Sequence, residues 1–362
     1  MHPLITTAPA ATALAARLAA QPRIGLDTEF LRERTYRAQL CLVQFASPDE
    51  AVCVDPLALA DLAPLAAVLA APGTTKVMHA CRQDLEVLLP VAGRTRPVFD
   101  TQVAASLAGF PAQVGYAELV RRLLGMELAK SHTRTDWSRR PLSPGEIEYA
   151  LDDVRYLLPL AAALHERLER LGRLAWLAEE LATVDAARAL PVAPGEAWLR
   201  VKGLRDLDPA RERLARALAA WRERRALEHD RPRGWILADP VLREIVLRVP
   251  RTRAALAQIP EIPAGLVKRH GEELLACVRE AAVPDPAPAP PGRTRPDPAQ
   301  AALVKELGAI IQAAARELNL APEVLATRRD LEQLARSERG GAPLRGWRAQ
   351  VLGARLLAAL AR

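Results

Sequence analysis

The sequence lacks several features that would place it in a large class of proteins. None of its apolar runs reaches the roughly 18 residues that a membrane-spanning helix requires, and its Ala-rich N-terminus has neither the basic start nor the Leu-rich stretch of a signal peptide. Only four cysteines occur, with no C-x-x-C spacing, so neither a zinc site nor a disulfide framework is indicated. We therefore expect a globular cytoplasmic protein with no membrane partner.

The charge of the chain is unevenly distributed. The net charge is +7 over 362 residues, but residues 1–200 carry a net −2 and residues 201–362 a net +9. Acidic side chains can bind metal ions, whereas a basic region attracts phosphate backbones. This division favours an enzyme that cuts nucleic acid.

Strand and helix patterns alternate in the first part of the chain. Apolar runs predict strands at Arg23–Phe30, Ala38–Ala46, Ala51–Val54 and Lys76–His79. Helices are predicted at Arg82–Leu89, at Thr101–Ala108 (led into by Pro97–Asp100) and along Tyr149–Arg173. This order predicts a three-layer α/β domain, which we assign to residues 1–200.

The remainder of the chain is predicted to be helical, because no convincing strand pattern follows Pro209. Residues 282–298 contain seven prolines and predict a semi-stiff linker. The linker separates two helical units, residues 201–281 and 299–362, which look like a divergent repeat of helix, short segment, helix, turn and closing helix. The alternative, that any two Ala- and Leu-rich stretches can be aligned in this way, remains open.

Four carboxylates and a tyrosine in three separated segments form a candidate active site. Asp27 and Glu29 stand two residues apart in an apolar strand, so both side chains leave the same face of the sheet. Tyr149 and Asp153 stand four residues apart and share a helix face. Asp84 lies in the first turns of a helix, where a lone Asp is more often a helix N-terminal charge than a ligand. Each segment alone is a weak signal.

Together, these residue types indicate metal-dependent hydrolysis of a phosphodiester bond. Hard oxygen ligands select Mg²⁺ or Mn²⁺, and two such ions can bind the attacking water and the leaving 3′ oxygen of an in-line displacement. Buried acids gathered in one place repel one another, and cations between them would relieve that repulsion. The hydroxyl of Tyr149, with an ordinary pKa of about 10, suits orienting the water better than accepting its proton.

The order of these motifs resembles the DEDDy exonucleases of the ribonuclease D kind. The resemblance is carried by Asp27-x-Glu29, His79-x4-Asp84-Leu-x2-Leu88 and Tyr149-x3-Asp153, and is strengthened by the run Thr135-Asp136-Trp137 to Arg140-Pro141-Leu142. The helical units resemble helicase-and-RNase-D C-terminal (HRDC) domains, the first much more clearly than the second. The resemblance implies a ribonuclease H-like exonuclease domain followed by two small all-α domains.

The resemblance also implies an activity. Asp27, Glu29, Asp84 and Asp153 would coordinate two divalent ions, Mg²⁺ or Mn²⁺, and Tyr149 would position the attacking water. The enzyme would hydrolyse RNA from its 3′ end to nucleoside 5′-monophosphates and would trim tRNA precursors with 3′ extensions, with no obligate protein partner. Six arginines are candidates for RNA contacts, although a structural or solvated role for each stays open: Arg134, Arg139, Arg140, Arg222, Arg225 and Arg233.

Two other functions are compatible with the same residues. A 3′→5′ DNA exonuclease would use the same chemistry, because the choice of RNA depends on contacts to the 2′-hydroxyl. The sequence has no G-x-x-x-x-G-K-[ST] loop, which argues against a replication enzyme. A non-catalytic RNA-binding protein on a degenerate nuclease fold is the second alternative, although such proteins usually lose one or more of the acids.

Overall fold

The chain forms two units in the computed structural model, which describes residues 4–128, 135–186, 194–204, 207–283, 298–336 and 341–361. The larger unit combines Met1–Leu31, Gln39–Ala189 and Pro296–Arg362, and the smaller unit combines Arg32–Ala38 with Leu190–Arg295. Most of the predicted Pro-rich linker lies outside the described residues. None of the helices described is both long enough and apolar enough to cross a membrane.

A six-stranded mixed sheet lies at the centre of the larger unit. Its order is β1-β4-β3-β2-β5-β6, in which β2–β3 and β3–β4 are antiparallel and the other pairs are parallel. The strands are β1 (Leu4–Ile5), β2 (Arg23–Leu31), β3 (Gln39–Ala46), β4 (Ala51–Val54), β5 (Thr75–Met78) and β6 (Val98–Asp100). The four strands predicted from apolar runs are present to within one residue at each end, whereas the two-residue β1 is too short to leave a pattern.

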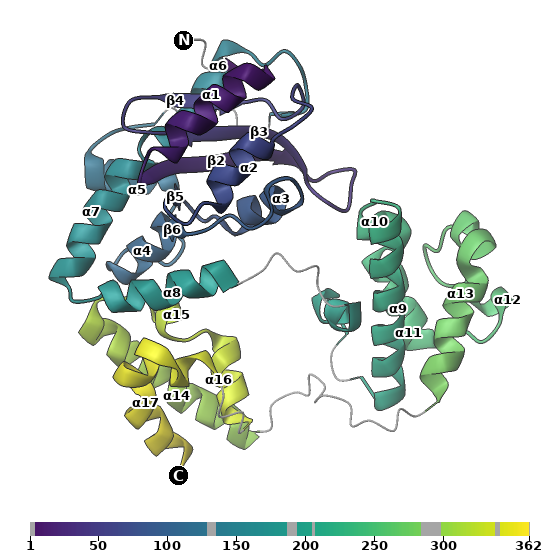
Figure 1. Ribbon diagram of the computed structural model, residues 1–362. Coiled ribbons are helices and arrows are strands. Elements are labelled where there is room, and N and C mark those ends of the chain that lie inside the picture. The colour runs from purple at the N-terminus through teal and green to yellow at the C-terminus, as the bar shows by residue number, and fades with distance from the viewer. Residues whose placement is uncertain are drawn as a thin grey trace. The chain divides into compact units, whose positions relative to one another are not determined.

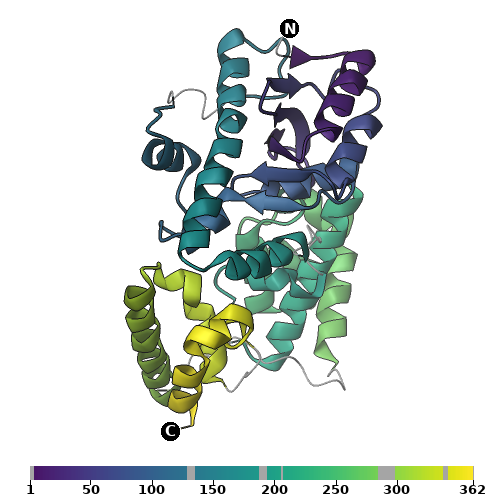
Figure 2. The same cartoon turned by 60° about the vertical axis from the view of Figure 1, so that its left-hand side comes forward.

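Helices cover both faces of the sheet (Figures 1 and 2). One layer contains α1 (Ala8–Ala19), α2 (Ala63–Ala70) and α3 (Arg82–Ala92), which pack in sequence, with α3 against β2 and β3. On the other face α6 (Pro144–Arg155) lies over β2, β3 and β4, and α7 (Leu157–Arg170) lies over β2 and β5. Further helices pack around α7: α4 (Thr101–Leu107), α5 (Tyr116–Leu124) and α8 (Leu174–Ala186).

The helical stretch predicted along Tyr149–Arg173 consists of two helices, because the chain breaks into α6 and α7 at Tyr156. Pro159 lies in the first turn of α7. Proline has no backbone N–H, and its ring collides with the carbonyl group four residues earlier, which here belongs to Arg155. The helix therefore ends at Arg155, and a new one starts two residues before the proline.

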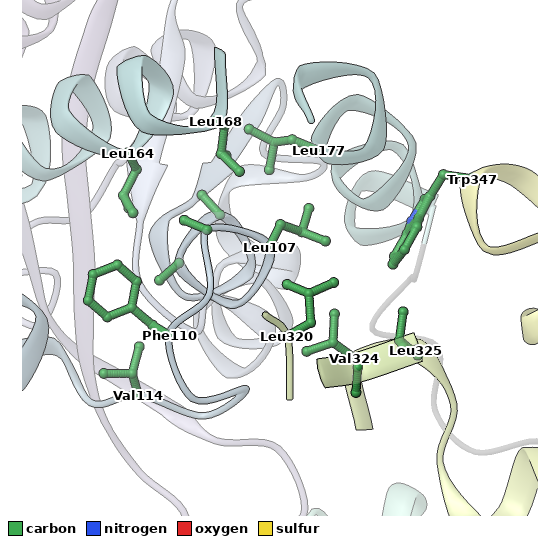
Figure 3. Close-up of a cluster of buried hydrophobic side chains, with 14 of the residues drawn as sticks. Leu107, Phe110, Val114, Leu164, Leu168, Leu177, Leu320, Val324, Leu325 and Trp347 are labelled. Carbon is green, nitrogen blue, oxygen red and sulfur yellow. The ribbon is translucent and has the colours of Figure 1, made fainter. Parts of the chain in front are cut away.

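The C-terminal helices share a hydrophobic core with the α/β part of the larger unit. Leu107, Leu168 and Leu177 pack in one cluster with Leu320, Val324 and Leu325, as Figure 3 shows. Trp347 stacks on Trp176 with ring centroids 4.4 Å apart, and its ring nitrogen donates to Glu180 at 2.7 Å. These helices are α14 (Pro298–Leu318), α15 (Pro322–Leu325), α16 (Arg328–Ala335) and α17 (Gly346–Leu360), with the 3-10 turn η2 (Ala342–Leu344) before the last.

Close backbone approach accompanies this shared core. Arg173 donates to the carbonyl oxygens of Leu107 at 2.7 Å and Leu318 at 2.5 Å, and so bridges the two parts. Gly346, with φ +53°, lies so close to Glu179 that an added Cβ would stand 2.0 Å from a carboxylate oxygen. A side chain at position 346 would therefore meet both backbone strain and a collision.

The smaller unit is helical and has a separate core around Leu214, Leu242 and Leu274. It contains η1 (Pro194–Arg200), α9 (Pro209–Glu228), α10 (Arg233–Ile236), α11 (Asp239–Arg248), α12 (Arg253–Ala257) and α13 (Ala264–Ala282). From α9 onward, the order of a long helix, a four-residue helix, a helix, a short turn and a long helix matches the order from α14 to α17. The predicted fold class, an α/β domain followed by a helical region, is confirmed. The division at residues 200, 281 and 298 stays a prediction.

Candidate active site

Asp27 and Glu29 project from β2 toward α6 and α7. Gly25 lies on the same strand face, and a Cβ at this position would stand 3.2 Å from the carbonyl oxygen of Val154 and 3.5 Å from Leu157. Because side chains alternate along a strand, residues 25, 27 and 29 share this face. The absence of a side chain at Gly25 lets the end of α6 approach the strand that carries the two acids.

Asp84 reaches the same region from α3. Strand β5 pairs with β2 only as far as Gly25, and the chain then turns into α3 beside the following residues of β2. Asp100 fixes this turn by accepting hydrogen bonds from the backbone N–H groups of Ala80 and Cys81, both at 3.0 Å. The hydroxyl of Thr28 donates to Asp84 at 2.5 Å. Asp84 is therefore fixed next to the strand positions of Asp27 and Glu29.

Tyr149 and Asp153 occupy one side of α6, which begins at a well-formed N-terminus. Ser143 accepts a hydrogen bond from the backbone N–H of Glu146, and the Glu146 carboxylate accepts one from the N–H of Ser143. This capping box fixes the start of the helix. Tyr149 follows one turn later, and Asp153 a turn after Tyr149.

A loop ahead of α6 supports Tyr149. Trp137 is buried, with 5% of its surface exposed, and its ring stacks on the ring of Tyr149 with centroids 6.2 Å apart. Arg140 donates to the Trp137 carbonyl at 2.7 Å and forms two bonds, at 2.6 and 2.7 Å, to the carboxylate of Asp55 at the end of β4. The loop is thereby tied to the sheet.

The four acids form one electrostatic cluster, which we call the acid cluster: Asp27, Glu29, Asp84 and Asp153. Burial and the charges of Asp84, Asp153 and Glu29 raise the pKa of Asp27 well above its usual value. Burial, followed by Asp153 and Asp84, raises the pKa of Glu29 to about 8. Burial raises the pKa of Asp84 to about 6 and that of Asp153 to about 7. Three distant segments therefore bring their carboxyl groups into one buried region.

Two tyrosines respond to the same charges. Burial raises the pKa of Tyr149 to about 12, and Asp153, Glu29 and Asp27 contribute to the rise. Burial also raises the pKa of Tyr116, to which Asp153 and Asp27 add. The hydroxyl of Tyr116 donates to the backbone oxygen of Asp152 at 3.0 Å and accepts from the N–H of Tyr156 at 3.2 Å, so this tyrosine secures the end of α6.

The chemistry of the acid cluster fits divalent cations. Its donors are carboxylate oxygens, which Mg²⁺ and Mn²⁺ prefer, and cations would offset the charge that raises the pKa values. Within the described residues, however, no group of three or more His, Cys, Asp or Glu side chains stands ready to hold a metal ion. Gln44 adds a buried amide to the region, and neither polar atom of its side chain has a hydrogen-bond partner among the described residues.

His79 and Asp152, which lie close to the acid cluster in sequence, have structural roles. Both ring nitrogens of His79 are engaged, at 2.9 Å from the Thr101 hydroxyl and 3.0 Å from the Val114 carbonyl, and burial lowers the pKa of His79. These two bonds give His79 a structural role. Asp152 is paired with Arg155 on the outer side of α6.

Two of the three candidate RNA-binding arginines of the larger unit, Arg139 and Arg140, have protein partners. Arg139 donates to Glu146 at 2.9 Å, although 61% of the Arg139 side chain is exposed. Arg140 is tied to Asp55 and to backbone oxygens. Arg134 lies outside the described residues. A contact with RNA therefore stays a prediction for all three, and Arg140 already has a structural function.

The candidates of the smaller unit are also engaged within their own unit. Arg222 is buried and donates to Asp239 at 2.5 Å and to the Leu237 carbonyl at 3.0 Å. Arg225 donates to Glu273 at 2.8 Å. Their roles in RNA binding stay predictions, and the ion pairs explain their positions without RNA.

Arg233 belongs to a half-buried polar cluster around Glu223. It donates to the fully buried Glu223 at 2.5 and 2.7 Å and lies 4.6 Å above the ring of Tyr36, whose hydroxyl also donates to Glu223. Nearby, Trp221 is buried in the core, whereas Trp235 is 60% exposed.

Sequence reasoning missed three residues of the acid region: Thr28, Gln44 and Tyr116. For Gln44 a signal existed, because it is the one polar residue in the apolar run from Leu40 to Ala46. Thr28 stands between the two acids of β2 but points to the opposite face. Tyr116 is far from the other residues in sequence, and no spacing connects it to them.

Comparisons with known proteins agree with this arrangement. A family model described as a 3′-5′ exonuclease matches residues 3–169, and a model described as an HRDC domain matches residues 211–278. Ribonuclease D of Acidiphilium cryptum is 40% identical over 359 residues, which span 97% of this chain and 91% of that protein. Ribonuclease D of Gluconacetobacter diazotrophicus is 42% identical over 98% of this chain and 92% of its own length.

A solved structure is similar along nearly the whole chain. The crystal structure of Escherichia coli RNase D, described as an exoribonuclease involved in structured RNA processing, matches with a TM-score of 0.89 at 32% identity. The match covers 99% of this chain and 98% of the Escherichia coli chain.

Proposed function

Since the chain belongs to the ribonuclease D family and is a 3′→5′ exoribonuclease, we propose that it hydrolyses RNA with the aid of two divalent cations. The ions are Mg²⁺ or Mn²⁺, the products are nucleoside 5′-monophosphates, and the ligands are Asp27, Glu29, Asp84 and Asp153. The observation that supports this most is that Asp84 in α3 and Asp153 in α6 raise the pKa values of both Asp27 and Glu29 in β2. Buried carboxylates gathered in this way need compensating positive charge.

The bound cations would supply Lewis acidity at the scissile phosphate and a source of hydroxide at neutral pH. Tyr149 orients the attacking water through its hydroxyl group. A phenol with its ordinary pKa of about 10 is protonated at neutral pH, which suits Tyr149 to orienting the water rather than to accepting its proton. The stack with Trp137 restricts the ring to one orientation.

We propose that the substrates are tRNA precursors with 3′ extensions. Support comes from the similar Escherichia coli enzyme, which is described as acting in structured RNA processing, and from the net charge of +9 on residues 201–362. A basic region attracts an RNA phosphate backbone in a salt-dependent way. The cytoplasm is the proposed compartment, and the four cysteines, all free and buried, are compatible with its reducing conditions.

A direct test follows the 3′ end of a 5′-labelled, 3′-extended tRNA transcript incubated with Mg²⁺ or Mn²⁺. We expect shortening by single nucleotides, and a matched DNA strand to be a poorer substrate. Asp153→Asn should slow trimming by more than about 100-fold, because it removes a proposed ligand. The matched control is Asp152→Asn, the neighbouring acid, which is paired with Arg155 and should leave the rate close to wild type.

Three results would contradict the proposal. These are equal trimming by the wild type and Asp153→Asn, trimming that persists in a chelator, and release of products longer than one nucleotide. Preference for the DNA strand would favour the DNA exonuclease instead.

A further inference from the structure

Gln44 is a polar side chain that is fully buried beside the acid cluster. Its exposed fraction is 0%, and both its amide nitrogen and its amide oxygen lack a hydrogen-bond partner among the described residues. Buried amides are nearly always hydrogen-bonded, because an unpaired one loses its bonds to water and gains nothing. An apolar residue at this position of β3 would avoid the cost of burying an unpaired amide, which points to a role for the amide other than packing.

The register of the sheet places Gln44 beside the acid cluster. In the antiparallel pair β2–β3, Gln44 stands directly across from Asp27, and directly opposed residues point to the same face with their Cβ atoms about 5 Å apart. On its other side Gln44 is paired with Cys53 of β4. The sulfur of Cys53 lies 4.0 Å from the carbonyl oxygen of Ile147 in α6. The row Asp27, Gln44 and Cys53 therefore faces the helix that carries Tyr149 and Asp153.

An amide has chemical properties that suit this position. It offers two N–H donors, whereas ionised carboxylates only accept. It is neutral, so it adds no further negative charge to four neighbouring acids, and unlike lysine or arginine it does not compete with a cation for the site. Carboxylates that bind metals are commonly held by such hydrogen bonds from behind.

We propose that Gln44 is a positioning residue of the acid cluster: its amide N–H, which has no partner among the described residues, would donate to the Asp27 carboxylate when a divalent cation binds there and so fix the orientation of that carboxylate. This inference rests on the proposed function, because it assumes that cations bind at Asp27. It assigns the buried amide to the metal-binding step rather than to the stability of the sheet.

The test compares Mn²⁺ affinity in the wild type and in Gln44→Met, measured from the electron paramagnetic resonance signal of free Mn²⁺ without any RNA. Methionine keeps the length and approximate volume of glutamine but has no N–H donor. We expect the dissociation constant for Mn²⁺ to rise about tenfold or more. The melting temperature without metal should stay the same or rise, because an unsatisfied buried amide has been removed.

Thr95→Val is the matched control. The hydroxyl of Thr95 is also buried and without a partner in the described part of the chain, but it precedes β6, at the end of the parallel strands opposite to Asp27. This substitution should not change Mn²⁺ affinity. If Gln44→Met does not fold, Gln44→Leu serves in the same measurement.

The outcomes separate this inference from the proposed function. Wild-type affinity in Gln44→Met, with or without a lower melting temperature, would show that Gln44 has a packing role only, and the inference would be wrong while the nuclease proposal stands. A wild-type protein that binds no Mn²⁺ would overturn both. Weaker Mn²⁺ binding together with near wild-type trimming at saturating Mn²⁺ would support the positioning role.

Discussion

The indole ring of Trp137 stacks on the phenol ring of Tyr149, with centroids 6.2 Å apart and planes inclined by 28°. Trp137 is itself held by the bond from Arg140 to its carbonyl oxygen, and Arg140 is anchored on Asp55. The tyrosine that we propose to orient water is thus tied through one ring and one guanidinium group to the end of β4.

Trp137→Ala should lower kcat by about 10-fold or more and change KM little, because a small displacement of a reacting group lowers the rate without removing substrate contacts. Trp137→Phe keeps a ring and should recover most of the rate. Combining Trp137→Ala with Tyr149→Phe gives a double-mutant cycle. Strictly additive losses in the cycle would show that Trp137 does not act through Tyr149.

The stability of the metal-free protein should fall as pH rises from about 5 to about 8. The pKa values of Asp84, Asp153 and Glu29 are raised to about 6, about 7 and about 8, so the folded chain binds more protons than the unfolded chain between about pH 4 and pH 8. The free energy of unfolding then decreases with pH through that interval. We expect the melting temperature to fall on the order of 5 °C.

Saturating Mn²⁺ should remove most of the decrease in melting temperature with pH, since cations favour the ionised carboxylates. Glu29→Gln should flatten the metal-free curve and raise the melting temperature at pH 8, while trimming is lost. A metal-free protein whose melting temperature rises with pH over this range would contradict the electrostatic account.

Trp347→Ala should destabilise the larger unit by about 3–5 kcal/mol, as expected for deleting a buried aromatic side chain. Trp347 is 1% exposed, stacks on Trp176 and donates to Glu180. Leu357→Ala, on the same helix but 50% exposed, should change stability by less than about 0.5 kcal/mol. Urea denaturation checks both, and equal effects would show that the shared core does not depend on Trp347.

Two arginines of α9 should contribute to different properties, Arg222 to stability and Arg224 to RNA binding. Arg222→Ala leaves the Leu237 carbonyl without its buried donor and should cost about 1–3 kcal/mol of stability. Arg224 is exposed and forms no ion pair within the described residues. If the smaller unit binds RNA, Arg224→Ala should leave the melting temperature unchanged and weaken RNA binding. The dependence of RNA affinity on salt concentration should fall by the equivalent of about one phosphate contact. Unchanged RNA affinity would place the RNA surface elsewhere.

Much of the fold could be predicted from the sequence because strands and helices have different apolar spacings. The strands β2 to β5 follow from apolar runs, and the α/β class follows from their alternation with helices. The break at Tyr156 was missed, although Pro159 carried the signal, because the apolar spacing continues through it. The pairing of the C-terminal helices with Leu107 and Leu177 depends on surface shape, which no local pattern records.

The acid cluster could be proposed from the sequence because its members stand at fixed spacings within their own elements. The side chains that surround it could not. That Gln44 lies beside the acid cluster follows only from the strand register, which places it across from Asp27. The candidate arginines follow from their charge and from their closeness in sequence to tryptophans or to the active-site helix. The structure gives Arg222, Arg225 and Arg233 carboxylate partners that sequence spacing does not indicate.

The most direct test of the account is anomalous diffraction from crystals of the protein soaked in Mn²⁺. The account predicts two anomalous peaks among the carboxylates of Asp27, Glu29, Asp84 and Asp153, with these side chains rotated toward the ions. Crystals that show no peak there at saturating Mn²⁺, or peaks only at other positions, would contradict it.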